Sequence, residues 1–184
     1  KGKNFARDRL KLLAARSGID SSVCQSIMER IIPTGSYADI AEADLVVEAV
    51  FEDPDVKTLV IRQVETHLRT DAIFATNTST LPISQLSRHC ERPDRYIGIH
   101  FFSPVERMAL VEIIPGAKTG KSTLAVALDF ARMIGKTPIV VKDVRGFYTN
   151  RIMPVYLAEA MIMVMEGVKP ALIENAASLI GMPV

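Results

Sequence analysis

Short apolar runs alternate with amphipathic segments along most of the chain. Runs rich in Val, Ile and Ala are typical of strands that are covered on both faces of a sheet. Such runs cover residues 44–50, 72–76, 97–100, 110–114 and 137–141. Apolar residues at helical spacing predict helices between them, over residues 53–68, 82–89 and 122–134. This alternation of strand and helix predicts a doubly wound α/β sheet.

Both flanks of the predicted sheet have a helical pattern. Before the sheet, helices are predicted over residues 4–16 and 20–30, and a short strand over residues 31–34. Beyond the last strand, two apolar helices are predicted over residues 149–166 and 169–179.

This pattern predicts two domains. Residues 1–145 would form the α/β domain, and residues 146–184 would begin an all-helical domain. Two helices cannot bury their apolar faces on their own, so the second domain should pack against further chain or another subunit. Its methionines are interpreted as core or interface residues rather than as ligands.

The composition is that of an ordinary globular protein, with 48% hydrophobic and 23% charged residues. A formal net charge of +1 argues against a nucleic-acid binder or another partner of polyanions. No apolar stretch is long enough to predict a transmembrane helix. Cys24 and Cys90 have neither metal-ligand nor redox spacing, which predicts no metal site and favours a reducing compartment.

Polar residues stand at the predicted ends of neighbouring strands. They are Glu52, Asn77, Ser79 and His100. Ligands of doubly wound sheets bind beyond the carboxyl ends of the strands. Any one of these residues alone is best interpreted as a turn residue or a cap. Because several occur at one predicted edge, a functional site at that edge is favoured.

His100 ends one apolar run, and Glu112 lies in the middle of the next. A buried carboxylate is costly unless it is paired, and His100 is the nearest candidate partner in the sequence. Such a pair would hold the imidazole in one tautomer and prepare it as a base near neutral pH. A loop histidine beside a structural Glu is the alternative interpretation.

Several spaced motifs resemble the L-3-hydroxyacyl-CoA dehydrogenase family of fatty-acid β-oxidation. They are DLVVEAVFE at residues 44–52, NTST at 77–80, GIHFFSP at 98–104, LVEII at 110–114 and GFYTNR at 146–151. The chain is most similar to the dehydrogenase part of multifunctional β-oxidation proteins, which also carry an enoyl-CoA hydratase domain. The resemblance implies a Rossmann-type NAD-binding domain, followed by a helical substrate and dimerisation domain.

The resemblance also implies a role for each matching residue. His100 would be the catalytic base that takes the proton of the 3-hydroxyl group, and Glu112 would hold its imidazole. Ser79 and Asn150 would orient the substrate oxygen beside the nicotinamide. The residues implied to contact the NAD cofactor are Val50, Glu52, Lys57, Asn77, Ser79 and Ser103.

The chain departs from the family pattern at some positions. Ser103 stands where many members have Asn, and Arg145 stands where Pro often precedes the Gly-Phe pair. The glycine-rich turn of the family, G-x-G-x-x-G, does not occur in the chain. We therefore expect an internal piece of a longer polypeptide that lacks the first βαβ part of the Rossmann domain. On its own, such a piece should bind NAD weakly and turn over little or no substrate.

The implied substrate is an (S)-3-hydroxyacyl-CoA, oxidised to the 3-oxoacyl-CoA in a homodimer or a larger β-oxidation complex. The expected location is the bacterial cytoplasm, or the mitochondrial or peroxisomal matrix in a eukaryote. One alternative is a related NAD-dependent hydroxyacid dehydrogenase, which the acyl-CoA dependence of the reaction would distinguish. The other is a non-catalytic assembly module, for which His100→Gln would leave function intact.

Overall fold

The chain forms two compact units in a computed structural model that describes residues 2–182, one unit ending at Ala41 and the other beginning at Glu42. The first unit contains helices α1 (Gly2–Ser17) and α2 (Ser21–Glu29) and a 3-10 turn, η1 (Tyr37–Ile40). Asp20 caps α2 by accepting a hydrogen bond from the backbone N of Ser22.

The predicted strand over residues 31–34 is wrong. No regular element covers these residues, and the side chain of Ile32 is 83% exposed. Pro33 has no N–H to donate to a ladder, and within residues 2–182 every strand of the sheet belongs to the second unit. Two apolar residues in sequence therefore find no neighbouring strand that would bury them.

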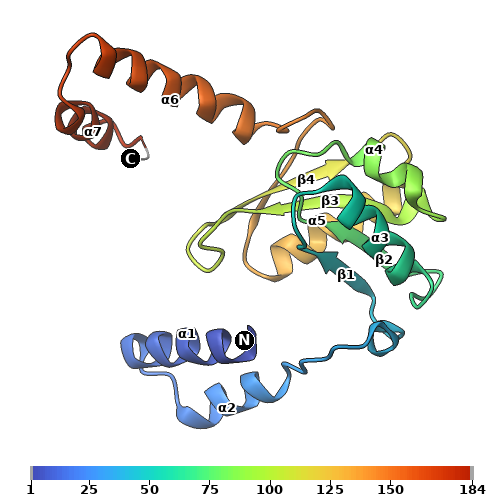
Figure 1. Cartoon of the computed structure of the whole chain (residues 1–184). Coiled ribbons are helices and arrows are strands. Elements are labelled where there is room, and N and C mark those ends of the chain that lie inside the picture. Colours follow the sequence, from blue (N-terminus) through green and yellow to red (C-terminus); the bar gives the residue numbers. More distant parts are fainter. Residues whose placement is uncertain (1, 183–184) are drawn as a thin grey trace. The chain divides into compact units, whose positions relative to one another are not determined.

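The second unit is built on one sheet with the strand order β1-β2-β3-β4-β5 (Figure 1). The strands are β1 (Leu45–Glu48), β2 (Ile73–Thr76), β3 (Tyr96–Phe101), β4 (Leu110–Pro115) and β5 (Thr137–Val140). The first three run parallel, β4 runs antiparallel to β3, and β5 runs parallel to β4. The reversal follows from the short connection over residues 102–109, because a parallel return needs a longer crossover.

Helices cover both faces of this sheet and confirm the predicted doubly wound α/β class (Figure 1). The helices and turns are α3 (Pro54–Glu65), α4 (Ile83–Leu86), η2 (Ser87–His89), η3 (Pro93–Arg95) and α5 (Lys121–Met133). Helix α3 begins where expected, because Asp53 accepts hydrogen bonds from Asp55 N and Val56 N and Pro54 occupies the first turn.

The alternation of side chains along the strands divides the residues between the two faces. One face packs its core against Ala127 and Ala131 of α5. The strand residues in that core are Ile73, Ala75, Ile97, Ile99, Val111 and Ile113. Because successive side chains point to opposite faces, the residues of the other parity share the second face. This second face therefore carries the polar residues Glu48, Thr76, His100 and Glu112.

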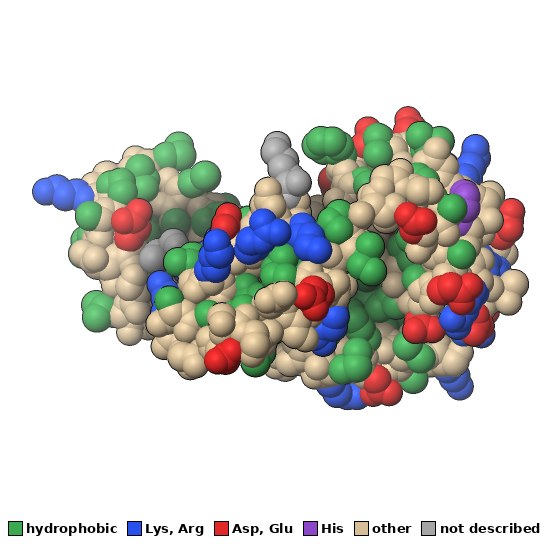
Figure 2. All heavy atoms as spheres, turned by 90° about the horizontal axis from the view of Figure 1, so that it is seen from below, with side chains coloured by type: hydrophobic (Ala, Val, Ile, Leu, Met, Phe, Trp, Pro, Cys, Tyr) green, Lys and Arg blue, Asp and Glu red, His purple; other side chains and the backbone are tan. Residues whose placement is uncertain are grey.

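The chain ends in two helices, α6 (Thr149–Met165) and α7 (Pro170–Leu179), close to the predicted bounds. Many of their apolar side chains are exposed, including those of Met161, Met165 and Leu179. Figure 2 shows hydrophobic side chains exposed between charged ones on the visible face of the molecule. Within residues 2–182, no helix combines the length and the hydropathy that a membrane span requires.

Candidate functional site

The centre of the site is a pair formed by His100 and Glu112. The two residues stand opposite each other in the antiparallel register of β3 and β4, so their side chains lie on the same face. Nδ1–H of His100 donates a hydrogen bond of 2.7 Å to Oε2 of Glu112. Glu112 has no exposed surface, and His100 is 6% exposed. The structure thus brings together the two residues that the sequence predicts as partners.

The second carboxylate oxygen of Glu112 binds the beginning of α6. Oε1 accepts hydrogen bonds from Thr149 N at 2.9 Å, Thr149 Oγ1 at 3.0 Å and Tyr148 N at 3.2 Å. Burial opposes ionisation of Glu112, but the hydrogen bonds from His100 and Thr149 outweigh it and lower the pKa of the carboxyl. Glu112 is therefore an anion at neutral pH.

The imidazole of His100 is enclosed by aromatic rings. Its centroid lies 4.6 Å from that of Phe102 and 6.2 Å from that of Phe147. Nδ1 is engaged with Glu112, while Nε2 has no hydrogen-bond partner among the described residues. A neutral imidazole with Nδ1–H held by a carboxylate presents Nε2 as an acceptor, which is the arrangement of a base.

A buried ionic cluster lies at the carboxyl ends of β1 and β2. Nζ of Lys57, a residue only 1% exposed, lies 2.9 Å from Oε1 of Glu48 and 3.5 Å from Oε2 of Glu52. Glu48 also accepts hydrogen bonds from the Thr76 hydroxyl and from Val50 N. Sequence reasoning missed Glu48, although the signal that pointed to Glu112, a single carboxylate in an apolar run, is present there too.

Glu52 organises the loop that follows β2. Its Oε1 accepts hydrogen bonds from Thr78 Oγ1 at 2.5 Å, Ser79 N at 2.9 Å and Thr80 N at 2.9 Å. Burial acts against the charge, but the hydrogen bonds from this loop and the nearby Lys57 ammonium together lower the pKa of Glu52 to about 2. The carboxylate of Glu52 therefore sets the backbone course around Ser79.

Two asparagines connect this loop with the His100 region. Nδ2 of Asn150, in the first turn of α6, donates to the backbone O of Ser79 at 2.9 Å. Oδ1 of Asn77 accepts from the backbone N of Phe101, the residue after His100, at 2.8 Å. The polar residues predicted at strand ends therefore belong to one hydrogen-bonded region, together with Asn150.

The remaining predicted residues lie at the surface of this region. Val50 is exposed, and its backbone N donates to Glu48. Ser103 is exposed, and its hydroxyl has no partner within the described part of the chain. Arg145 is exposed as well. Phe147 N closes the turn around it with a bond of 2.9 Å to Val144 O, and Gly146 N donates to Thr80 O at 3.1 Å.

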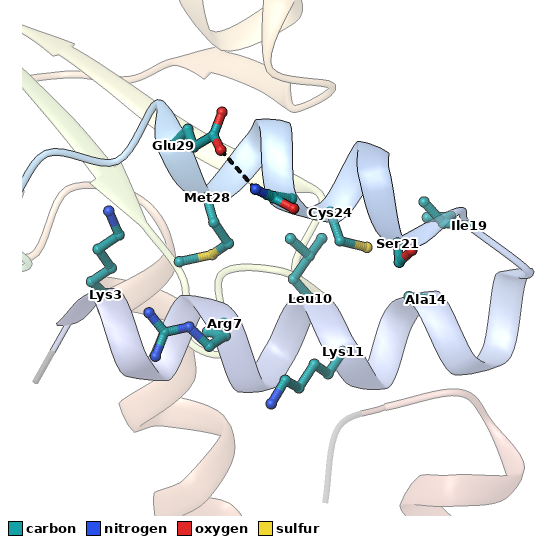
Figure 3. A pocket seen from close by; sticks show the side chains of 11 residues that line it. Lys3, Arg7, Leu10, Lys11, Ala14, Ile19, Ser21, Cys24, Met28 and Glu29 are labelled. Atoms are coloured by element: carbon teal, nitrogen blue, oxygen red, sulfur yellow. Dashed lines mark hydrogen bonds between the residues drawn. The ribbon is translucent and has the colours of Figure 1, made fainter.

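The described part of the chain has two hollows, one in the first unit and one bordering the hydrogen-bonded region at Phe147 and Tyr148. A groove of about 580 Å³ lies between α1 and α2 in the first unit, with Leu10 pointing towards α2, Met28 pointing towards α1, and Lys3, Arg7 and Lys11 along α1 (Figure 3). A second hollow of about 450 Å³ is lined by residues that include Lys142 and Arg151. Among residues 2–182, no group of His, Cys, Asp and Glu side chains is arranged to hold a metal ion.

Comparison with known proteins agrees with this geometry. Residues 1–144 match the family model of the 3-hydroxyacyl-CoA dehydrogenase NAD binding domain, and residues 146–184 match that of the C-terminal domain. The chain is 45% identical over 177 residues to a fatty acid oxidation complex subunit alpha of Shewanella loihica, covering 95% of this chain and 25% of that protein.

Solved structures give the same result. (S)-3-hydroxybutyryl-CoA dehydrogenase from Ralstonia eutropha is 35% identical with a TM-score of 0.89, over 94% of this chain and 61% of that one. 3-hydroxybutyryl-CoA dehydrogenase from Escherichia coli K12 is 29% identical with a TM-score of 0.86, over 91% of this chain and 35% of that one. The chain therefore spans a quarter of the curated relative and about three fifths of the first solved structure.

Proposed function

Because this chain belongs to the 3-hydroxyacyl-CoA dehydrogenase family, we propose that the polypeptide carrying it oxidises (S)-3-hydroxyacyl-CoA to 3-oxoacyl-CoA with NAD in fatty-acid β-oxidation. The observation that carries this proposal is the buried His100–Glu112 pair, whose Nε2 is left without a partner among the described residues. His100 lies at the carboxyl end of β3, which runs parallel to β2 and β1, and ligands of such sheets bind beyond the carboxyl ends of the parallel strands.

The hydrogen bonds support the roles that we propose for these residues. His100 accepts the proton of the 3-hydroxyl through Nε2, and Glu112 stabilises the imidazolium through Nδ1–H. NAD, when bound, supplies the acceptor for the hydride that leaves C3. Ser79 and Asn150 orient the reacting oxygen, in keeping with the bond between their two residues.

The residues at the strand ends fit the nicotinamide end of NAD. Glu52, Asn77 and Ser79 keep partly exposed polar side chains there, and Val50 and Ser103 are exposed beside them. Lys57 is buried and holds Glu48 and Glu52, so we assign it a positioning role rather than direct contact.

We also expect the 184-residue chain to bind NAD weakly, because no G-x-G-x-x-G turn occurs in it to hold the pyrophosphate. Calorimetric titration with NAD should give little heat with this chain and a defined isotherm with the full polypeptide that carries it. Tight binding to the 184-residue chain would contradict the proposal.

We further propose a domain boundary at residues 145 and 146, and a homodimer or larger β-oxidation complex as the assembly. The curated relative is itself named as a subunit of a complex. Cys24 and Cys90 are unpaired, in keeping with a cytoplasmic location, or with the mitochondrial or peroxisomal matrix in a eukaryote.

The deciding experiment is acetoacetyl-CoA-dependent oxidation of NADH by the full polypeptide. His100→Gln should lower kcat by about 10²–10⁴-fold, because the side-chain amide of Gln is too weak a base to take the proton of the substrate hydroxyl. His89→Gln is the matched control, since His89 is exposed on η2. Activity that survives His100→Gln would overturn the assignment of the base.

A related NAD-dependent hydroxyacid dehydrogenase is the second candidate. The same geometry supports it, because a base held as His100 is by Glu112 can take the proton of a hydroxyl group on either substrate. The same assay with free acetoacetate separates the two candidates. Equal rates with and without the CoA thioester would favour the second.

A further inference from the structure

We propose that Thr149 is a positioning residue for the His100–Glu112 pair. Its hydroxyl, with the first backbone N–H groups of α6, holds one oxygen of Glu112 so that the other oxygen faces the imidazole. This inference rests on the proposed function, in which His100 is the base.

The geometry around the carboxylate assigns separate tasks to its two oxygens. Among residues 2–182, the one donor to Oε2 is His100 Nδ1–H, at 2.7 Å. Oε1 accepts the Thr149 hydroxyl at 3.0 Å, besides the backbone N atoms of Thr149 and Tyr148. A rotation of the carboxylate would break bonds on both sides, so the donors on Oε1 also fix the direction of Oε2.

Helix α6 depends on the same carboxylate. Tyr148 occupies the N-cap position and provides no side-chain capping bond, and no acidic residue lies in the first turn. The first N–H groups of a helix need acceptors, and here Glu112 of β4 supplies them from another element. One buried carboxylate therefore caps α6 and orients the base of the proposed reaction.

The hydroxyl of Thr149 is the part of this arrangement that a side-chain substitution can remove. The backbone donors stay in Thr149→Val, which has nearly the same shape but no O–H. Loss of one donor leaves more charge on the carboxylate for the Nδ1–H bond, so Glu112 becomes a stronger acceptor. The same loss weakens the restraint on the orientation of the carboxylate. We expect this weaker restraint to lower the reaction rate by about three- to tenfold.

Thr149→Val should therefore change properties that a purely structural residue would not affect. The NMR resonance of the Nδ1–H proton of His100 should move downfield, in the 184-residue chain without cofactor. In the full polypeptide, kcat/KM for NAD-dependent oxidation of 3-hydroxybutyryl-CoA should fall by about three- to tenfold. The acid limb of its pH profile should shift to higher pH, because a stronger acceptor favours the imidazolium.

Matched variants separate the hydroxyl from other effects. Thr149→Ser keeps the donor and should restore both the resonance and the pH profile. Thr149→Ala also removes the donor, and Ala has a high helix propensity. It replaces the Val variant if that variant does not fold. Thr58→Val is the control for the chemical change itself, because the Thr58 hydroxyl donates to Pro54 O in α3, away from the pair.

Two outcomes would overturn the inference. In the first, Thr149→Val lowers the melting temperature but leaves the proton resonance and the acid limb unchanged, so Thr149 only supports α6. In the second, Thr149→Ser behaves like Thr149→Val, so the hydroxyl is not responsible. Failure of the proposed function is distinguishable, because wild-type polypeptide would then be inactive while the resonance still reports on the pair.

Discussion

Carboxylates set the chemistry of this site at the scale of single residues. Three carboxylates lie within or just after strands that are otherwise mostly apolar: Glu48, Glu52 and Glu112. Each accepts hydrogen bonds from several donors on other elements. Because a buried charge without partners is unfavourable, these donors are what allows the anions to exist in the folded protein. The partners differ. The Lys57 ammonium binds Glu48, the loop after β2 together with Lys57 binds Glu52, and the His100 imidazole with the start of α6 binds Glu112.

Glu52 should make the stability of the second unit depend on pH. Its folded-state pKa is lowered to about 2, below the value of about 4.3 expected in an unfolded chain. The stabilisation is thus complete above the unfolded value and is lost as the pH falls towards 2. Urea unfolding of wild type and Glu52→Gln should differ most at neutral pH and converge in acid.

The control for this measurement is Glu159→Gln, which changes an exposed carboxylate of α6. Its unfolding curve should follow that of wild type at every pH. A constant difference between wild type and Glu52→Gln down to about pH 2 would show that the charge of Glu52 is not the cause.

Close approach between elements explains the glycine in β3. A Cβ added at Gly98 would lie 2.7 Å from Cδ1 of Ile83 and 3.0 Å from Cβ of Ile114. Ile83 begins α4 and is fully buried, so it has little room to move. Gly98 therefore lets α4 and β4 pack against the same stretch of β3, two residues before His100.

Gly98→Ala should destabilise the protein by about 1–3 kcal/mol, as expected for overpacking of a dense core. Thermal or urea unfolding measures the effect, and Gly35→Ala is the control because nothing lies within 4 Å of its added Cβ. A Gly98→Ala variant as stable as wild type would mean that Ile83 can reposition without cost.

At the scale of the whole molecule, the last two helices, α6 and α7, have an exposed apolar surface. Met165 of α6 is 86% exposed and Leu179 of α7 is 87% exposed, with further apolar side chains between them. Exposed apolar surface of this extent is typical of a region that packs against further chain or another subunit. The proposed assembly would bury it.

Light scattering should accordingly give a mass above the monomer for the 184-residue chain at micromolar concentration. Met165→Glu should shift the population towards monomer, because burying a carboxylate in an apolar interface is unfavourable. Ile32→Glu is the control, since Ile32 is equally exposed but lies in the first unit. A monomeric mass for wild type would contradict self-association through these helices.

Much of this architecture is determined by the sequence itself. Apolar runs and caps such as Asp53 predict most elements, because local periodicity reports how much of each segment is buried. A lone carboxylate in an apolar run pointed to Glu112, and neighbouring strand ends pointed to Asn77 and Ser79. The predicted strand over residues 31–34 failed because a strand also needs a partner, which no local pattern reveals.

Only the tertiary structure decided which polar atoms meet. The antiparallel register of β3 and β4 aligns His100 with Glu112, and a slip of one residue would place them on opposite faces. The pairing of Lys57 with Glu48 and the bond from Thr149 to Glu112 join segments far apart in the sequence. Such contacts depend on packing and register across the whole sheet, so they follow from the fold rather than from any local pattern.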